Sequence, residues 1–227
     1  MPTAMTSVLG LLGGTFDPIH CGHIELAREV RAALALSAVR FVPAGDPPHR
    51  AAPVATAAHR LEMVELAIAG EPGLEVDARE IHRPGRSYTV PTLLELRREE
   101  PARRLALILG ADAFLGLPTW HRWRELFDLA HLVVVARPGV SFEDAMPPAL
   151  ADEWARRLRR DGAALVEESA GAIVTQPISA HPISASAIRT QLARGAAGIA
   201  AVRGLLPAAV LAYIDRNQLY RSRPDAT

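Results

Sequence analysis

The sequence predicts an α/β fold: a Rossmann-like, doubly wound parallel sheet flanked by helices, with a small helical part near the C-terminal end. Short apolar runs of strand length alternate along the chain with longer segments that carry apolar residues at helical spacing. A glycine-rich turn follows the first apolar run, which is where open α/β sheets bind their ligands. We expect a single domain over all 227 residues, with its core between about residues 8 and 220.

Four apolar runs have the length and composition of buried strands. Most are bounded by glycine, proline or charged residues, and strands of a parallel sheet that is covered on both faces are apolar throughout. The predicted strands are Val8–Leu12, Val39–Pro43, Leu105–Leu109 and Leu132–Ala136.

The predicted helices have apolar residues on one face and mainly arginine and glutamate on the other. Those between the strands supply the crossovers that parallel strands require, and the last two form the helical C-terminal part. The predicted helices are His23–Leu36, Ala57–Ala69, Thr89–Glu99, Pro148–Arg160, Ser184–Ala193 and Pro207–Asn217.

The composition excludes several classes of protein. The 25 basic residues balance 25 acidic ones, so binding of nucleic acid through bulk positive charge is not expected. All basic residues are arginine, which excludes Schiff-base chemistry and a phosphate-binding lysine. The single cysteine, Cys21, excludes an intramolecular disulfide and a multi-cysteine zinc site. No signal peptide is recognised and no apolar run approaches the ~18 residues of a membrane span, so we expect a cytoplasmic protein without a membrane partner.

The turn after the first strand carries the strongest functional signal. Residues 13–23 read GGTFDPIHCGH and lead into a helix. Free backbone N–H groups and the helix dipole favour an anion there, and Gly13 and Gly14 leave room for close approach. His20 and His23 are three residues apart, so both imidazoles can face one pocket and donate hydrogen bonds to a polyphosphate. The segment is neither a dinucleotide-binding G-x-G-x-x-G nor a P-loop.

Residues 13–23 resemble the G-G-x-F-D-P-x-H-x-G-H signature of the nucleotidyltransferase superfamily, whose members attack a nucleotide's α-phosphate and release pyrophosphate. A second signature of that superfamily, I-S-x-[ST]-x-I-R, is matched by ISASAIR at residues 183–189. Ser184 or Ser186 suits a helix N-cap that leaves N–H groups free for phosphate oxygens. Arg189, one turn further along, can reach the same phosphates with its forked guanidinium.

Five further segments narrow the resemblance to bacterial nicotinate mononucleotide adenylyltransferases. The resemblance extends from about Leu11 to Tyr220 and implies that ATP and nicotinate mononucleotide are the substrates, with the deamido dinucleotide and pyrophosphate as products. The matching segments are PPHR at 47–50, RLEM at 60–63, SYT at 87–89, GADAF at 110–114 and PTWH at 118–121.

The motifs and the resemblance together give a set of expected site residues. The expected catalytic residues are His20, His23 and Arg189. The expected ATP-binding residues are Gly13, Gly14, Thr15, Phe16, His20, His23, Gly110, Asp112, Ile183, Ser184, Ser186 and Arg189. The expected nicotinate mononucleotide-binding residues are His49, Ser87, Tyr88, Thr89, Trp120, His121 and Arg137. We expect no metal site on the protein and expect Mg²⁺ to be carried by the ATP phosphates, because the sequence offers no cluster of carboxylates.

The residue types on the mononucleotide side fit that assignment. Trp120 offers a flat face for a pyridine ring. Thr89 and His121 lie near predicted helix starts, where backbone N–H groups would bind a carboxylate and so favour nicotinate over nicotinamide. Some roles stay open. Asp112 either binds a ribose hydroxyl or orients the pocket, or it is a helix cap or an acidic residue of a first helical turn. Arg137 either binds phosphate or is a surface charge. Trp120 could also be a core aromatic residue, and Asp17 could hold the turn.

Three alternatives to this function remain at the level of the sequence. The first is an adenylyltransferase that accepts both nicotinate and nicotinamide mononucleotides, and the second is a pantetheine-phosphate adenylyltransferase. The third is a nucleotide-binding module without catalytic activity, which the intact His20, His23, Ser184 and Arg189 disfavour. The sequence leaves the oligomeric state open, a homo-oligomer included.

Overall fold

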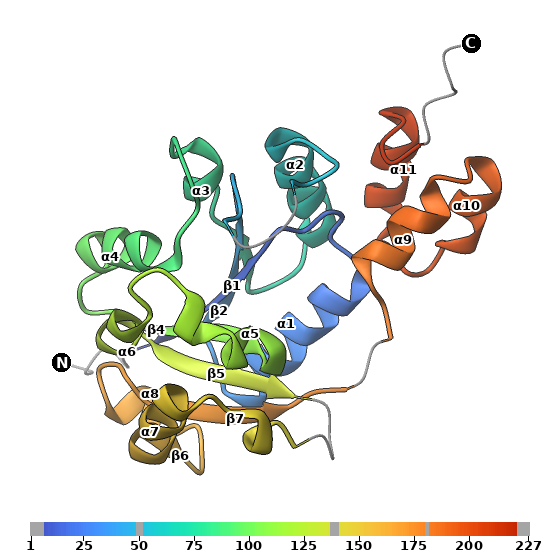
Figure 1. Cartoon of the computed structure of the whole chain (residues 1–227). Coiled ribbons are helices and arrows are strands. Elements are labelled where there is room, and N and C mark those ends of the chain that lie inside the picture. Colours follow the sequence, from blue (N-terminus) through green and yellow to red (C-terminus); the bar gives the residue numbers. More distant parts are fainter. Residues whose placement is uncertain (1–6, 49–51, 137–140, 180–181, 222–227) are drawn as a thin grey trace.

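A seven-stranded parallel sheet forms the centre of the computed structural model, which describes residues 7–48, 52–136, 141–179 and 182–221 (Figure 1). The strand order is β3-β2-β1-β4-β5-β7-β6. The strands are β1 (Val8–Gly14), β2 (Ala38–Pro43), β3 (Leu74–Val76), β4 (Arg104–Gly110), β5 (His131–Ala136), β6 (Leu158–Arg159) and β7 (Ile173–Pro177). The predicted fold class is confirmed.

Helices cover both faces of this sheet. They are α1 (Cys21–Ala33), α2 (Ala57–Ile68), α3 (Arg79–His82), α4 (Thr89–Glu99), α5 (Ala111–Leu115), α6 (Leu126–Leu129), α7 (Pro148–Arg157), α8 (Ala164–Glu167), α9 (Ala185–Leu192), α10 (Ala196–Ala201) and α11 (Ala208–Arg216). Three short 3₁₀ helices are η1 (Leu117–Thr119), η2 (Trp123–Glu125) and η3 (Glu143–Ala145). In the described residues, no helix has the length and apolar character needed to cross a membrane.

Each central strand is buried on both faces, which is why its sequence is apolar throughout. In β1, Val8 and Leu12 join one hydrophobic cluster, whereas Leu9 and Leu11 join the other. The first cluster also contains residues from α1, α2, α9 and α11, and the second contains residues from α4, α5, α6 and α7. The C-terminal helices α9 to α11 therefore extend the layer that α1 and α2 begin, as Figure 1 shows.

The predicted strands and helices all occur, but the sequence missed the edges of the sheet. β3 and β6 have only three and two residues, and β7 (IVTQP) is buried only at its first two positions. The predicted helix Pro148–Arg160 is wrong at its end: α7 stops at Arg157, and β6 follows at once. There Leu158 and Arg159 pair with β7, and the Arg159 guanidinium bonds Glu168 (Nε to Oε1, 2.6 Å).

The strand order creates a switch point beside β1. From β1 the chain runs outward to β2 and β3, and from β4 it runs outward in the opposite direction to β5 and β7. The loops after β1 and β4 therefore turn apart and leave a crevice at the carboxyl ends of these strands.

The buried His131 makes stability depend on pH. His131 has no exposed surface, its Nδ1 accepts a hydrogen bond from the Ala172 N–H (3.3 Å), and burial lowers its pKa from 6.5 to about 4. Between pH 6.5 and pH 4, His131 therefore binds a proton in the unfolded chain but not in the folded chain. The free energy of unfolding should thus fall by up to about 1.4 kcal/mol per pH unit for this group as pH drops from 6.5 towards 4.

Replacing His131 by asparagine tests this origin, because asparagine keeps an acceptor for the Ala172 N–H but does not titrate. We expect His131→Asn to lose about one proton's worth of pH dependence in urea unfolding between pH 7 and pH 4.5. The exposed His82→Asn substitution is the control and should keep the wild-type slope. Equal slopes for His131→Asn and the wild-type protein would contradict the explanation.

Candidate active site

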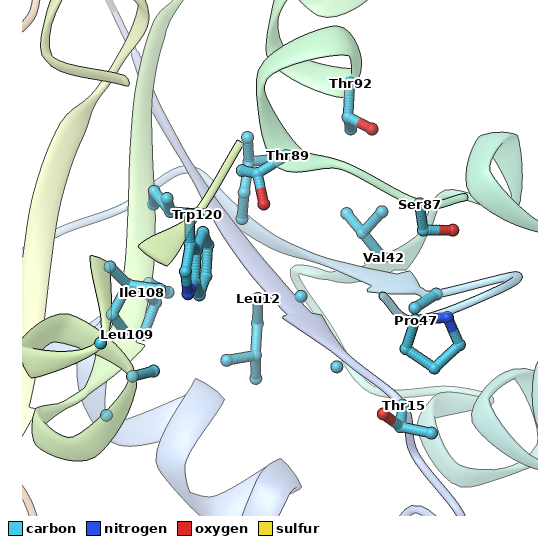
Figure 2. Close-up of a pocket in the computed structure, with 18 of the residues that line it drawn as sticks. Leu12, Thr15, Val42, Pro47, Ser87, Thr89, Thr92, Ile108, Leu109 and Trp120 are labelled. Atoms are coloured by element: carbon cyan, nitrogen blue, oxygen red, sulfur yellow. The ribbon is translucent and has the colours of Figure 1, made fainter. Parts of the chain in front are cut away.

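A cavity of about 880 Å³ opens at the carboxyl edge of the sheet, at the switch point. The ends of β1, β4 and β5 contribute Gly13, Gly110 and Ala136 to its lining. In Figure 2, Trp120 and Thr89 lie on one side of this cavity, Thr15 and Pro47 lie on the other, and Leu12 lies between them. The cavity thus lies where the strand order predicts a ligand.

Glycines at two neighbouring strand ends leave this cavity open. A Cβ atom added at Gly13 or Gly110 would meet nothing within 4 Å, so both positions face free space. A Cβ atom at Gly14 would instead lie 2.8 Å from the Phe16 ring. The two glycines of the motif therefore differ in their surroundings: Gly13 faces the open cavity, and Gly14 makes room for the Phe16 ring.

The two motif histidines form one stacked unit at the start of α1. His20 is the N-cap of the helix, and its ring stacks on that of His23 with the centroids 3.7 Å apart. The His20 N–H donates to His23 Nδ1 (3.3 Å), so a neutral His23 carries its proton on Nε2. His23 lines the cavity, whereas His20 is not part of the lining and is only 7% exposed. Burial lowers the pKa of His20 to about 4, which keeps this ring uncharged at neutral pH.

Asp17, in the first motif, is occupied by contacts within the protein. Its Oδ1 accepts hydrogen bonds from the Ala55 N–H (3.1 Å) and the Tyr220 hydroxyl (2.7 Å), and its Oδ2 accepts one from the Val54 N–H (2.8 Å). The structure therefore places this carboxylate in the role of holding the turn. Burial and the bond to Asp17 raise the pKa of Tyr220 well above its usual value, so the hydroxyl stays protonated and donates.

The second motif packs against the first, although it does not line the cavity. Arg189 Nη1 donates to the Asp17 carbonyl oxygen (2.7 Å), and Nη2 donates to Ser186 Oγ (3.2 Å). Ser184 is the N-cap of α9, as predicted, and its hydroxyl makes no capping bond. The expected site residues that are described but lie outside the cavity lining are Phe16, His20, Ile183, Ser184, Ser186 and Arg189.

The segment Ser87-Tyr88-Thr89 forms another part of the cavity wall. Thr89 is the first residue of α4, Tyr88 is its N-cap, and no side chain caps this helix. The Tyr88 ring lies 4.6 Å from the ring of His121, which is exposed in the turn between η1 and η2. Trp120 lines the cavity and also packs against the second hydrophobic cluster. The structure thus brings Tyr88, Thr89, Trp120 and His121 together.

The hydroxyl of Ser87 is engaged by the loop after β2. Ser87 is buried, and its Oγ accepts hydrogen bonds from the N–H groups of Gly45 (2.9 Å) and Asp46 (3.3 Å). It therefore joins two walls of the cavity. Asp112 lies in the first turn of α5, exposed and on the cavity lining, so contact with a ribose hydroxyl is compatible with its place. It is not the cap of this helix, because Gly110 is the N-cap and no side chain makes a capping bond. His49 and Arg137 lie outside the described residues.

Sequence reasoning missed three buried polar residues at or next to the cavity: Glu80, Thr92 and Arg60. Thr92 Oγ1 donates to Glu80 Oε1 (2.6 Å) and accepts from Arg83 Nη1 (3.0 Å). Burial raises the pKa of Glu80, which lines the cavity together with Thr92. Arg60 is 1% exposed and lies on the same apolar face of α2 as Met63 and Ala67. An arginine at such a position of the helical pattern was the signal available in the sequence.

Metal ligands do not gather in the described part of the chain. Among residues 7–48, 52–136, 141–179 and 182–221, no group of three or more His, Cys, Asp or Glu side chains is arranged to hold a metal ion.

Known proteins resemble this chain in sequence and fold. The cytidylyltransferase-like family model matches residues 11–191. A Halorhodospira halophila protein described as a probable nicotinate-nucleotide adenylyltransferase is 53% identical over 202 residues, which are 89% of this chain and 90% of the relative. A Dechloromonas aromatica protein of the same description is 49% identical over 220 residues, which are 96% of this chain and all of the relative.

A solved structure shares the fold at low sequence identity. The Plasmodium falciparum nicotinic acid mononucleotide adenylyltransferase complexed with NaAD superposes with a TM-score of 0.70 at 15% identity, covering 94% of this chain and 97% of the other. Since the family model covers most of the chain and close relatives align over nearly their whole length, the chain belongs to the nicotinate-nucleotide adenylyltransferase family of cytidylyltransferase-like proteins.

Proposed function

We propose that the protein transfers AMP from ATP to nicotinate mononucleotide and releases pyrophosphate, giving nicotinate adenine dinucleotide in NAD biosynthesis. The observation that carries this proposal is one cavity lined by His23, by the glycine ends of β1 and β4, and by Tyr88, Thr89, Trp120 and His121. The names of the bacterial relatives and the dinucleotide bound to the Plasmodium enzyme support it.

The reaction is a direct in-line displacement. A phosphate oxygen of nicotinate mononucleotide attacks the α-phosphorus of ATP, the bond from that phosphorus to the bridging oxygen breaks, and Mg²⁺-bound pyrophosphate leaves. The attacking phosphate is already an anion, so the protein need supply neither a nucleophile nor a strong base. Its contribution is to align the substrates and to stabilise the charge that develops on the phosphates.

On the ATP side, the stacked histidines act as a unit. His23 presents Nε2–H, a hydrogen-bond donor for the α-phosphate or the leaving group, because its Nδ1 accepts from the His20 N–H. We assign His20 to the same charge stabilisation, and the Gly13, Gly14, Thr15, Phe16 and Gly110 positions to contact with ATP. Arg189, with Ile183, Ser184 and Ser186 nearby, is assigned to the triphosphate. Since Arg189 holds the Asp17 carbonyl oxygen, phosphate binding would have to replace or share that bond.

On the acceptor side, the N-terminus of α4 and Trp120 define the ring pocket. The Thr89 N–H lies at a helix start without a side-chain cap, which suits a ring carboxylate better than a carboxamide. Trp120 supplies the face on which the ring stacks, and Tyr88 and His121 border it. We assign Ser87 to this wall, Asp112 to a ribose hydroxyl, and His49 and Arg137 to the mononucleotide phosphate.

The finer properties are proposed with this function. We infer that Mg²⁺ arrives with ATP, because phosphate oxygens are its preferred ligands. The single-domain organisation over residues 1–227 and the cytoplasmic location remain predictions, and so does self-association, for which light scattering during size-exclusion chromatography is the measurement.

A panel of acceptors tests the function directly. With MgATP, we expect pyrophosphate release with nicotinate mononucleotide, at least tenfold slower turnover with nicotinamide mononucleotide, and none with phosphopantetheine. The difference follows from the carboxylate-binding N–H groups at Thr89, which an amide NH₂ cannot satisfy. Equal turnover with both mononucleotides would support the dual-specificity enzyme, and ATP binding without pyrophosphate release would indicate a module without catalytic activity.

Removing the His23 imidazole tests the proposed donor. We expect His23→Ala to lower kcat about 10²-fold or more, corresponding to about 3 kcal/mol of transition-state stabilisation. Pyrophosphate release under saturating substrates measures this loss, and the exposed His82→Ala variant is the control. A His23→Ala enzyme with near-normal kcat would contradict the assignment.

Two glycine substitutions separate the roles of Gly13 and Gly14. A methyl group at Gly13 enters the free space of the cavity, so Gly13→Ala should fold normally but raise KM for ATP at least severalfold. A methyl group at Gly14 meets the Phe16 ring, so Gly14→Ala should lower the free energy of unfolding by about 1–3 kcal/mol. Thermal unfolding and steady-state kinetics of both variants distinguish the two effects, and a Gly13→Ala enzyme with wild-type kinetics would contradict the assignment.

A further inference from the structure

The buried Arg60 joins the two loops that follow β1 and β2. Its Nη1 donates to the Thr15 carbonyl oxygen (2.7 Å), and its Nη2 donates to the Gly45 carbonyl oxygen (2.9 Å). At 1% exposure it is the largest fully buried side chain in the described residues. Arginine is almost never fully buried in proteins unless it is paired, so this position calls for an explanation.

These two hydrogen bonds join the chain segments that follow β1 and β2, just beyond the last paired residues of the two strands. β1 and β2 pair in parallel as far as Gly14 and Pro43, and the last backbone bond between them runs from the Ala44 N–H to the Gly14 carbonyl oxygen (2.9 Å). Past that point, no backbone–backbone hydrogen bond joins the described residues of the two loops, and side chains connect them instead: Asp17 binds the N–H groups of Val54 and Ala55 further along, and Arg60 acts next to the strand ends. The Arg60 guanidinium joins the loops there because its fork spans one carbonyl oxygen from each loop.

Gly45 is fixed from its other sides as well. Its N–H donates to Ser87 Oγ (2.9 Å), and a Cβ atom there would collide with the Glu80 carbonyl oxygen. The carbonyl oxygen of Gly45 thus accepts a hydrogen bond from Arg60, and the N–H group of Gly45 donates one to Ser87, the residue that precedes Tyr88 and Thr89 in the cavity wall. The β2 loop is therefore held between the ATP side and the acceptor side of the cavity.

Burying the charged side chain of Arg60 costs free energy that burying an apolar side chain would not. Burial lowers the pKa of its guanidinium, and the Asp17 carboxylate is the main charge that offsets this. Its Nε has no hydrogen-bond partner among the described residues. An apolar side chain of similar size often gives equal or greater stability at such a site, so the guanidinium is better explained by geometry than by stability.

We propose that Arg60 is a positioning residue that sets the separation between the β1 loop and the β2 loop. This inference rests on the proposed function, in which the β1 loop holds ATP and the β2 loop, which lines the cavity at Ala44, Pro47 and Pro48, borders the acceptor. The separation of these loops then fixes the distance between the α-phosphorus and the attacking oxygen. Small errors in such a distance lower the rate of the chemical step while each substrate still binds.

Arg97 provides a matched control. It also donates to backbone carbonyl oxygens, from Nε to Leu129 (2.7 Å) and from Nη1 to Arg103 (2.7 Å), and burial lowers its pKa too. Leu129 and Arg103 precede β5 and β4, so these bonds lie at the amino ends of the strands, away from the cavity. Replacing Arg97 thus removes a similar interaction without touching the site.

The experiment compares Arg60→Met, Arg60→Lys and Arg97→Met with the wild-type enzyme. For Arg60→Met we expect kcat to fall at least tenfold, with the calorimetric Kd for ATP within about threefold of wild type. Arg97→Met should match its loss of thermal stability but keep kcat. Arg60→Lys should fold and recover only part of kcat, because one ammonium group cannot reproduce the fork.

Addition of guanidinium at non-denaturing concentration should raise kcat of an Arg60→Ala variant and leave Arg97→Met unchanged. If Arg60→Met does not fold, Arg60→Lys decides the question: wild-type kcat in that variant would overturn the proposal. An equal fall in kcat for Arg97→Met would also overturn it, since the effect would then be general destabilisation. An inactive wild-type enzyme would contradict the proposed function, whereas a fully active Arg60→Met enzyme would contradict the role of Arg60 alone.

Discussion

The parallel pairing of β1 with both β2 and β4 is the constraint on which the site depends. It places β1 in the interior of the sheet, buried on both faces, and it directs the neighbouring chain segments to opposite sides. The end of β1 is thus the one place where the loops on either side turn away and leave a cavity between them. The motif histidines, the glycines and the Asp17 turn all follow directly from this strand.

Several buried polar groups lie among the apolar residues around that strand end. Asp17, Arg60 and Glu80 are each less than 10% exposed. Asp17 and Arg60 bind backbone groups of the loops that follow β1 and β2, and Glu80 accepts a hydrogen bond from the Thr92 hydroxyl of α4. Apolar packing is non-directional, so it can bury a loop but does not fix which way a carbonyl or N–H group points. Hydrogen bonds do fix this, because an unmet buried donor or acceptor is costly. These buried polar groups therefore set the conformation of the loops, and the two apolar clusters set the stability of the fold.

The sequence was sufficient for the elements whose burial pattern is strong. The strands β1, β2, β4 and β5 and the helix Thr89–Glu99 were predictable because burial on two faces, or on one helical face, leaves a regular apolar pattern. The edge strands β3 and β6 and the neighbouring strand β7 were not, since a two- or three-residue strand, or one buried at only two positions, leaves no such pattern. Tertiary pairing rather than local propensity forms them.

The same division applies to the site. Motif spacing predicted that His20 and His23 share one helix start, but it did not indicate that His23 lines the cavity while His20 is not part of the lining. Likewise, the Gly-Gly pair did not reveal which glycine faces the ligand space, because that depends on where the Phe16 ring packs. The Ser87 hydroxyl was expected to contact the substrate, yet its Oγ accepts hydrogen bonds from the N–H groups of Gly45 and Asp46, residues more than 40 positions earlier in the chain. Such partners are fixed by topology, which a motif does not contain.

The absence of lysine fits this architecture. Arg60, Arg97 and Arg189 each bind two or more acceptors through separate nitrogens of one planar group, and most of those acceptors are backbone carbonyl oxygens from different segments. A lysine ammonium is a compact point charge with a strongly held hydration shell, so it is poorly suited to join two fixed loops inside a core. Arginine keeps its charge when buried and holds both acceptors at a set distance. In the described part of this chain the guanidinium fork therefore joins separate segments at both ends of the sheet, by Arg97 at the amino end and by Arg60 and Arg189 at the carboxyl end.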